Sequence, residues 1–260
     1  TGILGFKPTF GTISRSGMSP ISQRLDHPGI YANCVEDIDL VASVILSYDS
    51  EDLDMIQNYQ YKNDLNLNKS LKFGFVRGPV WNFGDEDMKN GIEEFVKNSQ
   101  LDIEELDLGK DFEDAAKAHE IIMNGSIANS LINYYQADKS MLHPFTVKRI
   151  EAGIPVSASD YVSAIEKAKK MEKILRQLFL KYDSIITPAA PGQAPRDLMN
   201  TGNAIFNGYW TMMGVPAISL PFLKGRNNLP IGIQFIATWS EDLKLLEICN
   251  EVLKKEKLAD

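Results

Sequence analysis

The feature that most constrains the fold is a strand–helix–strand order in the middle of the chain. Residues 71–76 alternate as a β-strand does. A helix with Met88, Ile92 and Phe95 on one face follows, and residues 101–108 then resemble a second strand. A helix between two strands at this spacing is typical of a parallel crossover, in which the helix packs on the sheet. This order predicts an α/β fold.

Later segments extend the pattern to a mixed β-sheet flanked by helices. Further strands are expected at residues 183–188, 215–221 and 230–236, the last two joined by turn-like residues 224–228. Further helices are expected from Asn33 as N-cap, at 111–135 with a break at Asn124–Gly125, at 159–181 and from Ser240 onward. Residues 49–70 are polar and predict a surface connection. No clean boundary is visible, so residues 1–260 are expected to form part of one domain.

Charge and composition limit the class of function. The chain has 260 residues, of which 44% are hydrophobic, with 27 Lys and Arg against 35 Asp and Glu. The formal net charge of −8 leaves no excess of cations for phosphates or anionic headgroups, so neither nucleic acid nor membrane is expected as a partner. Cys34 and Cys249 are too few for a disulfide framework. We therefore expect a cytoplasmic protein in which both thiols are buried.

The common site chemistries find little support in the residue pattern. His27, His119 and His143 stand alone, and no cysteine pair has zinc-ligand spacing, so no metal is expected. The glycine motifs that bind nucleotides do not occur, and no cofactor is expected. Ser126 follows Gly125, but it falls within helical periodicity, which favours a kink or an N-cap over a nucleophile.

Two motif-bearing stretches are more specific. The first comprises residues 2–9, 11–15, 25–29 and 35–37, and the second comprises residues 187–191, 206–207, 210–211, 214–221 and 229–234. In order and spacing both resemble amidase-signature hydrolases, whereas residues 49–180 match only in coarse pattern. The resemblance implies a mixed sheet flanked by helices and the hydrolysis or transfer of carboxylic amides.

The same resemblance implies that the catalytic residues lie outside this sequence. In the family a serine nucleophile belongs to a Gly-Gly-Ser stretch just before the point matched by Thr1, and a relay serine and a neutral lysine base lie further upstream. The chain contains no Gly-Gly dipeptide. We therefore expect an incomplete, C-terminal portion of an amidase that is inactive alone. Its partners would be a small-molecule amide and the missing N-terminal portion or another copy of the chain.

An incomplete fold would leave part of the sheet uncovered. If covering strands are missing, residues 1–10 should form an unusually exposed apolar edge. The alternative is a non-catalytic binding or assembly module that kept the scaffold and lost the chemistry. The coding sequence immediately upstream of Thr1 would distinguish the two, because only the enzyme requires an in-frame Gly-Gly-Ser stretch there.

The resemblance also implies a set of pocket residues. Phe206, Asn207 and Trp210 match positions that approach the acyl pocket, although core packing explains a Trp at helical spacing equally well. Tyr135 and Arg149 are weaker candidates, with a core tyrosine and a solvated arginine as the alternatives.

Two further positions bear on the site and the substrate. Asp26 matches an aspartate that supports the active-site segment by pairing with its arginine, and a loop-capping role is the alternative. In glutamine-dependent amidotransferases an aspartate holds the glutamine amine, and Ala204 falls near that place here. This favours a general amidase over an enzyme that uses glutamine.

Overall fold

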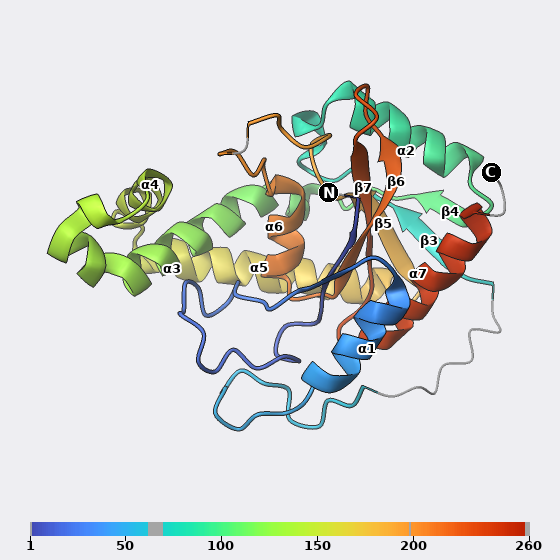
Figure 1. Cartoon of the computed structure of the whole chain (residues 1–260). Coiled ribbons are helices and arrows are strands. Elements are labelled where there is room, and N and C mark those ends of the chain that lie inside the picture. Colours follow the sequence, from blue (N-terminus) through green and yellow to red (C-terminus); the bar gives the residue numbers. More distant parts are fainter. Residues whose placement is uncertain (1, 62–69, 198, 258–260) are drawn as a thin grey trace.

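Figure 1 shows the computed structural model, which describes residues 2–61, 70–197 and 199–257. The strands are β1 (Leu4–Lys7), β2 (Ile30–Ala32), β3 (Lys72–Phe75), β4 (Asp102–Glu105), β5 (Ser184–Pro188), β6 (Ala217–Lys224) and β7 (Pro230–Ile236). The α-helices are α1 (Val35–Ile45), α2 (Glu86–Asn98), α3 (Ala115–Asp138), α4 (Pro144–Gly153), α5 (Ala158–Leu178), α6 (Ile205–Met212) and α7 (Asp242–Lys257). Short 3₁₀ turns span Trp81–Phe83, Lys110–Phe112 and Lys139–Met141.

The strands form one mixed sheet in the order β2-β1-β6-β7-β5-β3-β4. Strand β3 pairs in parallel with β4 and with β5, and the remaining neighbours pair antiparallel. The parallel crossover predicted from residues 71–108 is confirmed, with Phe73 opposite Ile103. The hairpin predicted around residues 224–228 is also confirmed, because β6 and β7 are antiparallel neighbours. The α/β fold class therefore follows the sequence prediction.

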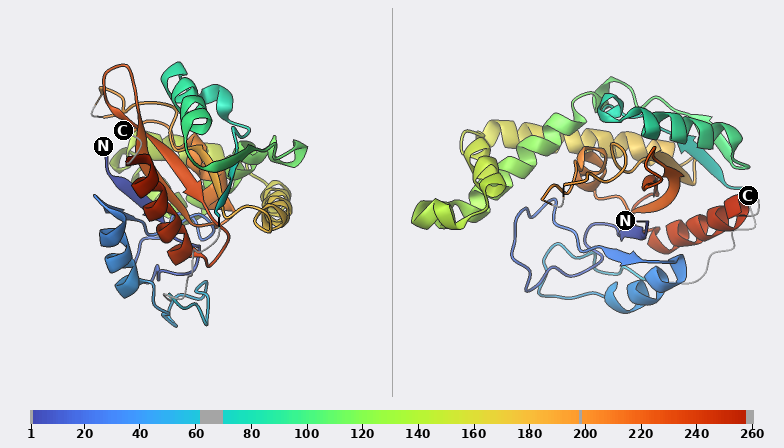
Figure 2. Two further views of the ribbon diagram at one scale, coloured as in Figure 1. Left: turned by 90° about the vertical axis from the view of Figure 1, so that its right-hand side faces the viewer. Right: turned by 45° about the horizontal axis from the view of Figure 1, so that its top comes forward.

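Helices lie on both sides of the sheet (Figures 1 and 2). Helices α1 and α7 lie side by side at one side, and the long helices α3 and α5 run together at the other. Between them the core closes on large aromatic side chains, with Phe73 and Phe235 in edge-to-face contact at 6.2 Å. Among the described residues, no helix has both the length and the apolarity needed to cross a membrane.

Two helix starts and the interior of one helix differ from the predictions. Helix α1 has Cys34, not Asn33, at its N-cap position, without a side-chain capping bond. Cys34 is half-buried, so a buried thiol is confirmed for Cys249 only. Helix α3 continues through Gly125 without a break, because tertiary packing along its length outweighs the weak helix propensity of glycine. Asp242 begins α7 as a buried residue that accepts hydrogen bonds from Thr9.

The expected exposed edge at residues 1–10 is wrong. Strand β1 lies inside the sheet, because β2 from the same chain pairs with one side of it and β6 with the other. Leu4 and Phe6 are accordingly buried. Exposed apolar side chains gather instead at Tyr31 of β2 and on α1, at Leu40 and Val44. Of the expected surface connection, residues 62–69 lie outside the described residues.

Candidate functional site

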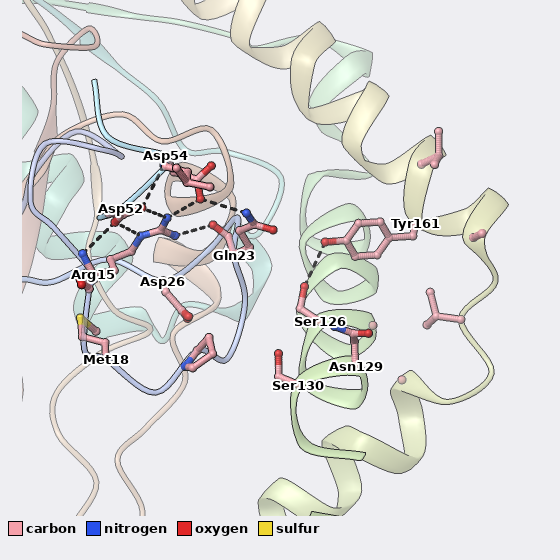
Figure 3. Close-up of a pocket in the computed structure, with 18 of the residues that line it drawn as sticks. Arg15, Met18, Gln23, Asp26, Asp52, Asp54, Ser126, Asn129, Ser130 and Tyr161 are labelled. Atoms are coloured by element: carbon pink, nitrogen blue, oxygen red, sulfur yellow. Dashed lines mark hydrogen bonds and ion pairs between the residues drawn. The ribbon is translucent and has the colours of Figure 1, made fainter. Parts of the chain in front are cut away.

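Two cavities lie beside the motif-bearing stretches. The first, here the loop–helix cavity, has a volume of about 810 Å³. One wall comes from loop residues 15–26 and 51–54, and the other from α3 and the start of α5 (Figure 3). The second, the sheet-face cavity, has a volume of about 610 Å³ and lies over β1, β6 and β7, beside α6.

The loop wall of the first cavity is built on one arginine. Arg15 donates through Nε and a terminal nitrogen to both carboxylate oxygens of Asp52, at 3.1 and 3.0 Å, and also binds Asp54. Another nitrogen donates to the Gln23 carbonyl at 2.6 Å. Hydrogen bonds from Arg15 hold the pKa of Asp52 at about 2, below its ordinary value, against the opposing effect of burial. The guanidinium is thus used to order two loops.

The helix wall carries hydroxyl groups. Ser22 Oγ donates to Ser126 Oγ at 3.0 Å, and Ser126 Oγ lies 3.1 Å from Tyr161 Oη. Ser130 Oγ donates to the Ile21 carbonyl, which fixes the loop against α3. Ser126 therefore bonds to other hydroxyls rather than to a basic side chain. This arrangement suits ligand binding or packing, and it provides no activation of a serine nucleophile.

The floor of the sheet-face cavity is formed by the side chains that alternate onto one face of the sheet. Gly5 lies opposite Ser219, and Ser219 lies opposite Gln234, so one row of small or amide side chains crosses three strands. Gly232 lies beside this row, and a Cβ there would come within 2.4 Å of Ser219 Oγ. The small residues at positions 5, 219 and 232 leave space on this face, and Tyr31 of β2, opposite Gly5, borders it.

Helix α6 supplies one wall of this cavity. Asn207 lines it with a half-buried side chain. Trp210 borders the cavity but is buried, as is Phe206 on the same helix, so both aromatic side chains pack in the core. Gln234 Nε2 donates to the Phe206 carbonyl at 2.9 Å and to the Pro188 carbonyl at 2.7 Å. Both bonds are buried, so Gln234 fixes α6 and the end of β5 against the sheet.

Lys7 and His27 also line the sheet-face cavity, although the sequence motifs predicted a role for neither. Lys7 Nζ donates to the carbonyls of Pro8 and Val215, at 3.0 and 2.6 Å. Burial lowers the pKa of Lys7 to about 7, with nearby Asp242 opposing the shift. Strand alternation could have indicated this residue, because Lys7 faces the same side as Gly5 and opposite to Leu4 and Phe6.

The remaining predicted site residues lie elsewhere. Asp26 lines the loop–helix cavity, and its Oδ2 accepts from the backbone N–H groups of Ile21 and Ser22. Tyr135 Oη donates to Glu151, and Arg149 donates to Asn124 Oδ1 at 3.0 Å. Tyr135 and Arg149 therefore belong to the packing of α3 with α4, and neither lines either cavity. Within the described residues, no group of three or more His, Cys, Asp or Glu is placed to hold a metal ion.

Comparison with known proteins identifies the family to which the chain belongs. The family described as Amidase matches residues 1–246, and the chain belongs to this family. Among its relatives, a glutamyl-tRNA(Gln) amidotransferase subunit from Agathobacter rectalis is 27% identical, covering 99% of this chain and 58% of the relative. The corresponding protein of Fusobacterium nucleatum is 29% identical, with 98% and 59% covered. The chain thus spans about three-fifths of the length of these relatives.

Solved structures agree on the fold. A crystal structure of an amidase superposes with a TM-score of 0.80 at 19% identity, covering 95% of this chain and 57% of that one. The allophanate hydrolase of Kluyveromyces lactis superposes with a TM-score of 0.82 at 19% identity, covering 98% and 43%. The sheet and helices described above are therefore those of amidase structures.

Proposed function

We propose that this chain supplies the C-terminal portion and the pocket walls of an amidase that cleaves the C–N bond of a carboxylic amide. The serine nucleophile, the relay serine and the lysine base would precede Thr1. The observation that carries the proposal is the family match over residues 1–246 in a sequence that lacks the Gly-Gly-Ser stretch. Because β1 is covered by its neighbours, the proposal rests on the order and spacing of the motifs and draws nothing from an exposed edge.

The sheet-face cavity is the proposed amide-binding wall. Asn207 offers a carboxamide with both donors and an acceptor, and the buried Trp210 supports the same wall from the core. Gln234 holds α6, which carries both residues, by two buried hydrogen bonds. A rigidly held wall of this kind contributes to catalysis by orienting the substrate carbonyl toward a nucleophile supplied from elsewhere. The reaction would then proceed by acyl transfer to the serine and hydrolysis of the acyl group.

The proposed substrate is a small-molecule amide other than glutamine. The curated relatives are amidotransferase subunits, but the family resemblance implies an aspartate for glutamine-dependent enzymes near the position that Ala204 occupies here. A partner chain is part of the proposal, in the form of the N-terminal portion or a second copy. The cytoplasm is the proposed compartment, because both cysteines are free.

The test compares two lengths of the same protein. One sample is the 260-residue chain, and the other extends it with the residues that its gene encodes immediately before Thr1. Ammonia release from a panel of primary amides is measured for both. The proposal expects hydrolysis only in the extended protein. A start codon in place of a Gly-Gly-Ser stretch, together with no hydrolysis by either sample, would support the binding or assembly module instead.

A further inference from the structure

The sheet-face cavity contains a buried lysine, Lys7, whose amino group plays no part in the proposed amide hydrolysis. This residue ends β1, an interior strand, and its side chain lies on the cavity face of the sheet. The side chain keeps some exposure to the cavity, while protein atoms surround its amino group. A buried lysine at the wall of a cavity is unusual, because burial of an ammonium without a counter-charge is costly.

The hydrogen bonds of Lys7 match a neutral amine. Its Nζ donates to two carbonyl oxygens, those of Pro8 and Val215. A neutral amine has two N–H groups, so both are used and the nitrogen lone pair remains free. An ammonium would carry a third N–H, for which the contacts of the described residues provide no acceptor. The local geometry therefore fits the free base.

The charged groups around Lys7 do not restore the ammonium. Asp242, at the start of α7, is the carboxylate that favours the charged form of Lys7, but its oxygens accept from the backbone N–H and the hydroxyl of Thr9, each at 2.7 Å. Tyr59 also bonds to Asp242, and burial raises the pKa of this carboxyl group. Burial likewise lowers the pKa of Lys7 to about 7, so a large share of the amine is unprotonated near neutral pH.

His27, at the same cavity, is a neutral ring and also leaves the Lys7 amine without a counter-charge. Its Nδ1 lies 2.9 Å from the Leu25 carbonyl, so this nitrogen carries the hydrogen and Nε2 is the free acceptor. Nε2 is buried and has no hydrogen-bond partner among the described residues. Burial, with a further contribution from Lys7, lowers the pKa of His27 to about 3, which keeps the ring neutral. Arg15 and Arg24 act in the same direction with smaller effects.

We propose that the sheet-face cavity is a covalent site for small carbonyl compounds, with Lys7 as the nucleophilic amine. The chemical class of ligand is an aldehyde or an unhindered ketone that fits a space of about 610 Å³ beside Trp210. Nothing in this reaction requires a residue outside the present sequence, so its outcome is independent of the proposed amide hydrolysis.

The reaction balances with the groups named. The Lys7 nitrogen attacks the carbonyl carbon, a C–N bond forms, and the carbonyl oxygen becomes a hydroxyl after a proton moves from nitrogen to oxygen through solvent water. Loss of the second proton from nitrogen and departure of the hydroxyl as water then give the imine. No oxidant or reductant takes part, and water reverses the reaction.

The test is reductive labelling of the intact chain with propanal and sodium cyanoborohydride, which traps the imine as a secondary amine. Peptide mass spectrometry then gives the extent of labelling at each lysine across a pH series. Exposed Lys97 and Lys173 serve as internal references. At pH 7 we expect Lys7 to react at least about tenfold faster than either reference, because an ordinary lysine is almost entirely protonated there. The rate at Lys7 should reach half its maximum near its pKa of about 7.

One variant sharpens this test. Ser219→Phe fills the floor of the cavity and should reduce labelling of Lys7 by about tenfold while leaving Lys97 unchanged. Circular dichroism and the thermal midpoint check that this variant is folded. Failure of Lys7 to react in the unmodified chain while Lys97 and Lys173 do, or the same pH profile at all three lysines, would overturn the proposal.

Discussion

The two cavities of this chain are built in opposite ways. The loop–helix cavity is held by ion pairs and hydroxyl contacts that join loops to helices, with Arg15 and Asp52 at its centre. The sheet-face cavity lies on three hydrogen-bonded strands, and its titratable residues Lys7 and His27 are held near their neutral forms by burial. Ion pairs therefore stabilise the first cavity, whereas burial in the second favours the uncharged forms of its titratable side chains.

The two cavities show two ways in which one family fold holds the wall of a cavity in place. A wall made from strand residues has a register fixed by the sheet, so it can present an amide-binding surface with little adjustment. A wall made from loops depends on each ion pair that orders it. The stability that depends on the sheet-face cavity should therefore change at alkaline pH, and the stability that depends on the loop–helix cavity should change at acid pH.

The largest expected effect is the alkaline titration of Lys7. Its pKa is about 7 in the folded chain and near 10.5 when unfolded, so between these pH values the unfolded chain binds more protons. The free energy of unfolding should rise from pH 7 to pH 10.5, by up to about 4 kcal/mol from this residue. Urea unfolding of Lys7→Met should lose the rise, whereas exposed Lys97→Met should keep it. An unchanged rise in Lys7→Met would contradict the neutral sheet-face cavity.

Next in size is the loss of the Gln234 side chain. The Gln234→Leu variant leaves the buried carbonyls of Pro188 and Phe206 without their donor, at a cost of about 2–4 kcal/mol in the free energy of unfolding. Because α6 is then released, affinity for small amides should fall as well. Exposed Gln177→Leu is the matched control and should change stability by less than about 0.5 kcal/mol. Equal effects of the two variants would show that Gln234 does not fix this wall.

The loop–helix cavity should respond to acid. The pKa of Asp52 is about 2 when folded and 3.8 when unfolded, so its contribution is present above pH 3.8 and lost as the pH falls toward 2. Asp52→Asn should remove about 1–2 kcal/mol of this acid dependence, measured by urea unfolding at several pH values. Glu51→Gln, at an exposed position on the same loop, should leave it in place. An acid profile that Asp52→Asn does not alter would contradict a cavity ordered by ion pairs.

The smallest predicted effect concerns the hydroxyl groups. Ser126→Ala should cost about 0.5–1.5 kcal/mol, because it removes the partner of both Ser22 and Tyr161. A double-mutant cycle with Tyr161→Phe isolates the contact between Ser126 and Tyr161. Exposed Ser163→Ala serves as the control. A coupling energy of zero would mean that Ser126 and Tyr161 do not act together at the helix wall.

Local sequence patterns predicted most of the sheet but less of the cavities. The alternation at residues 71–76 and 230–236 was sufficient for β3 and β7, because strands buried in a sheet carry their signal in a few apolar residues. The burial of β1 was missed, because pairing with β2 involves only three residues and depends on the long loop between them. Asn207 and Trp210 were placed near a pocket through the family resemblance, and periodicity alone could not distinguish their positions from that of Phe206.

Tertiary contacts explain the residues that no pattern indicated. Asp242 lies near the start of the helix expected from Ser240, and it is buried against Thr9, which is 233 positions away along the chain. Lys7 and His27 meet at one cavity because a strand and a loop converge there. Such pairs depend on packing between distant segments, which neither hydrophobic periodicity nor local spacing records.

The most direct test of the proposed function uses a serine-directed fluorophosphonate on the 260-residue chain. Intact mass and peptide mapping report any modified serine, and the protein extended upstream of Thr1 serves as the positive control. If this chain supplies pocket walls and no nucleophile, the extended protein is labelled at one serine and the present chain at none. Stoichiometric labelling of a serine within residues 2–260, Ser126 included, would contradict the proposal.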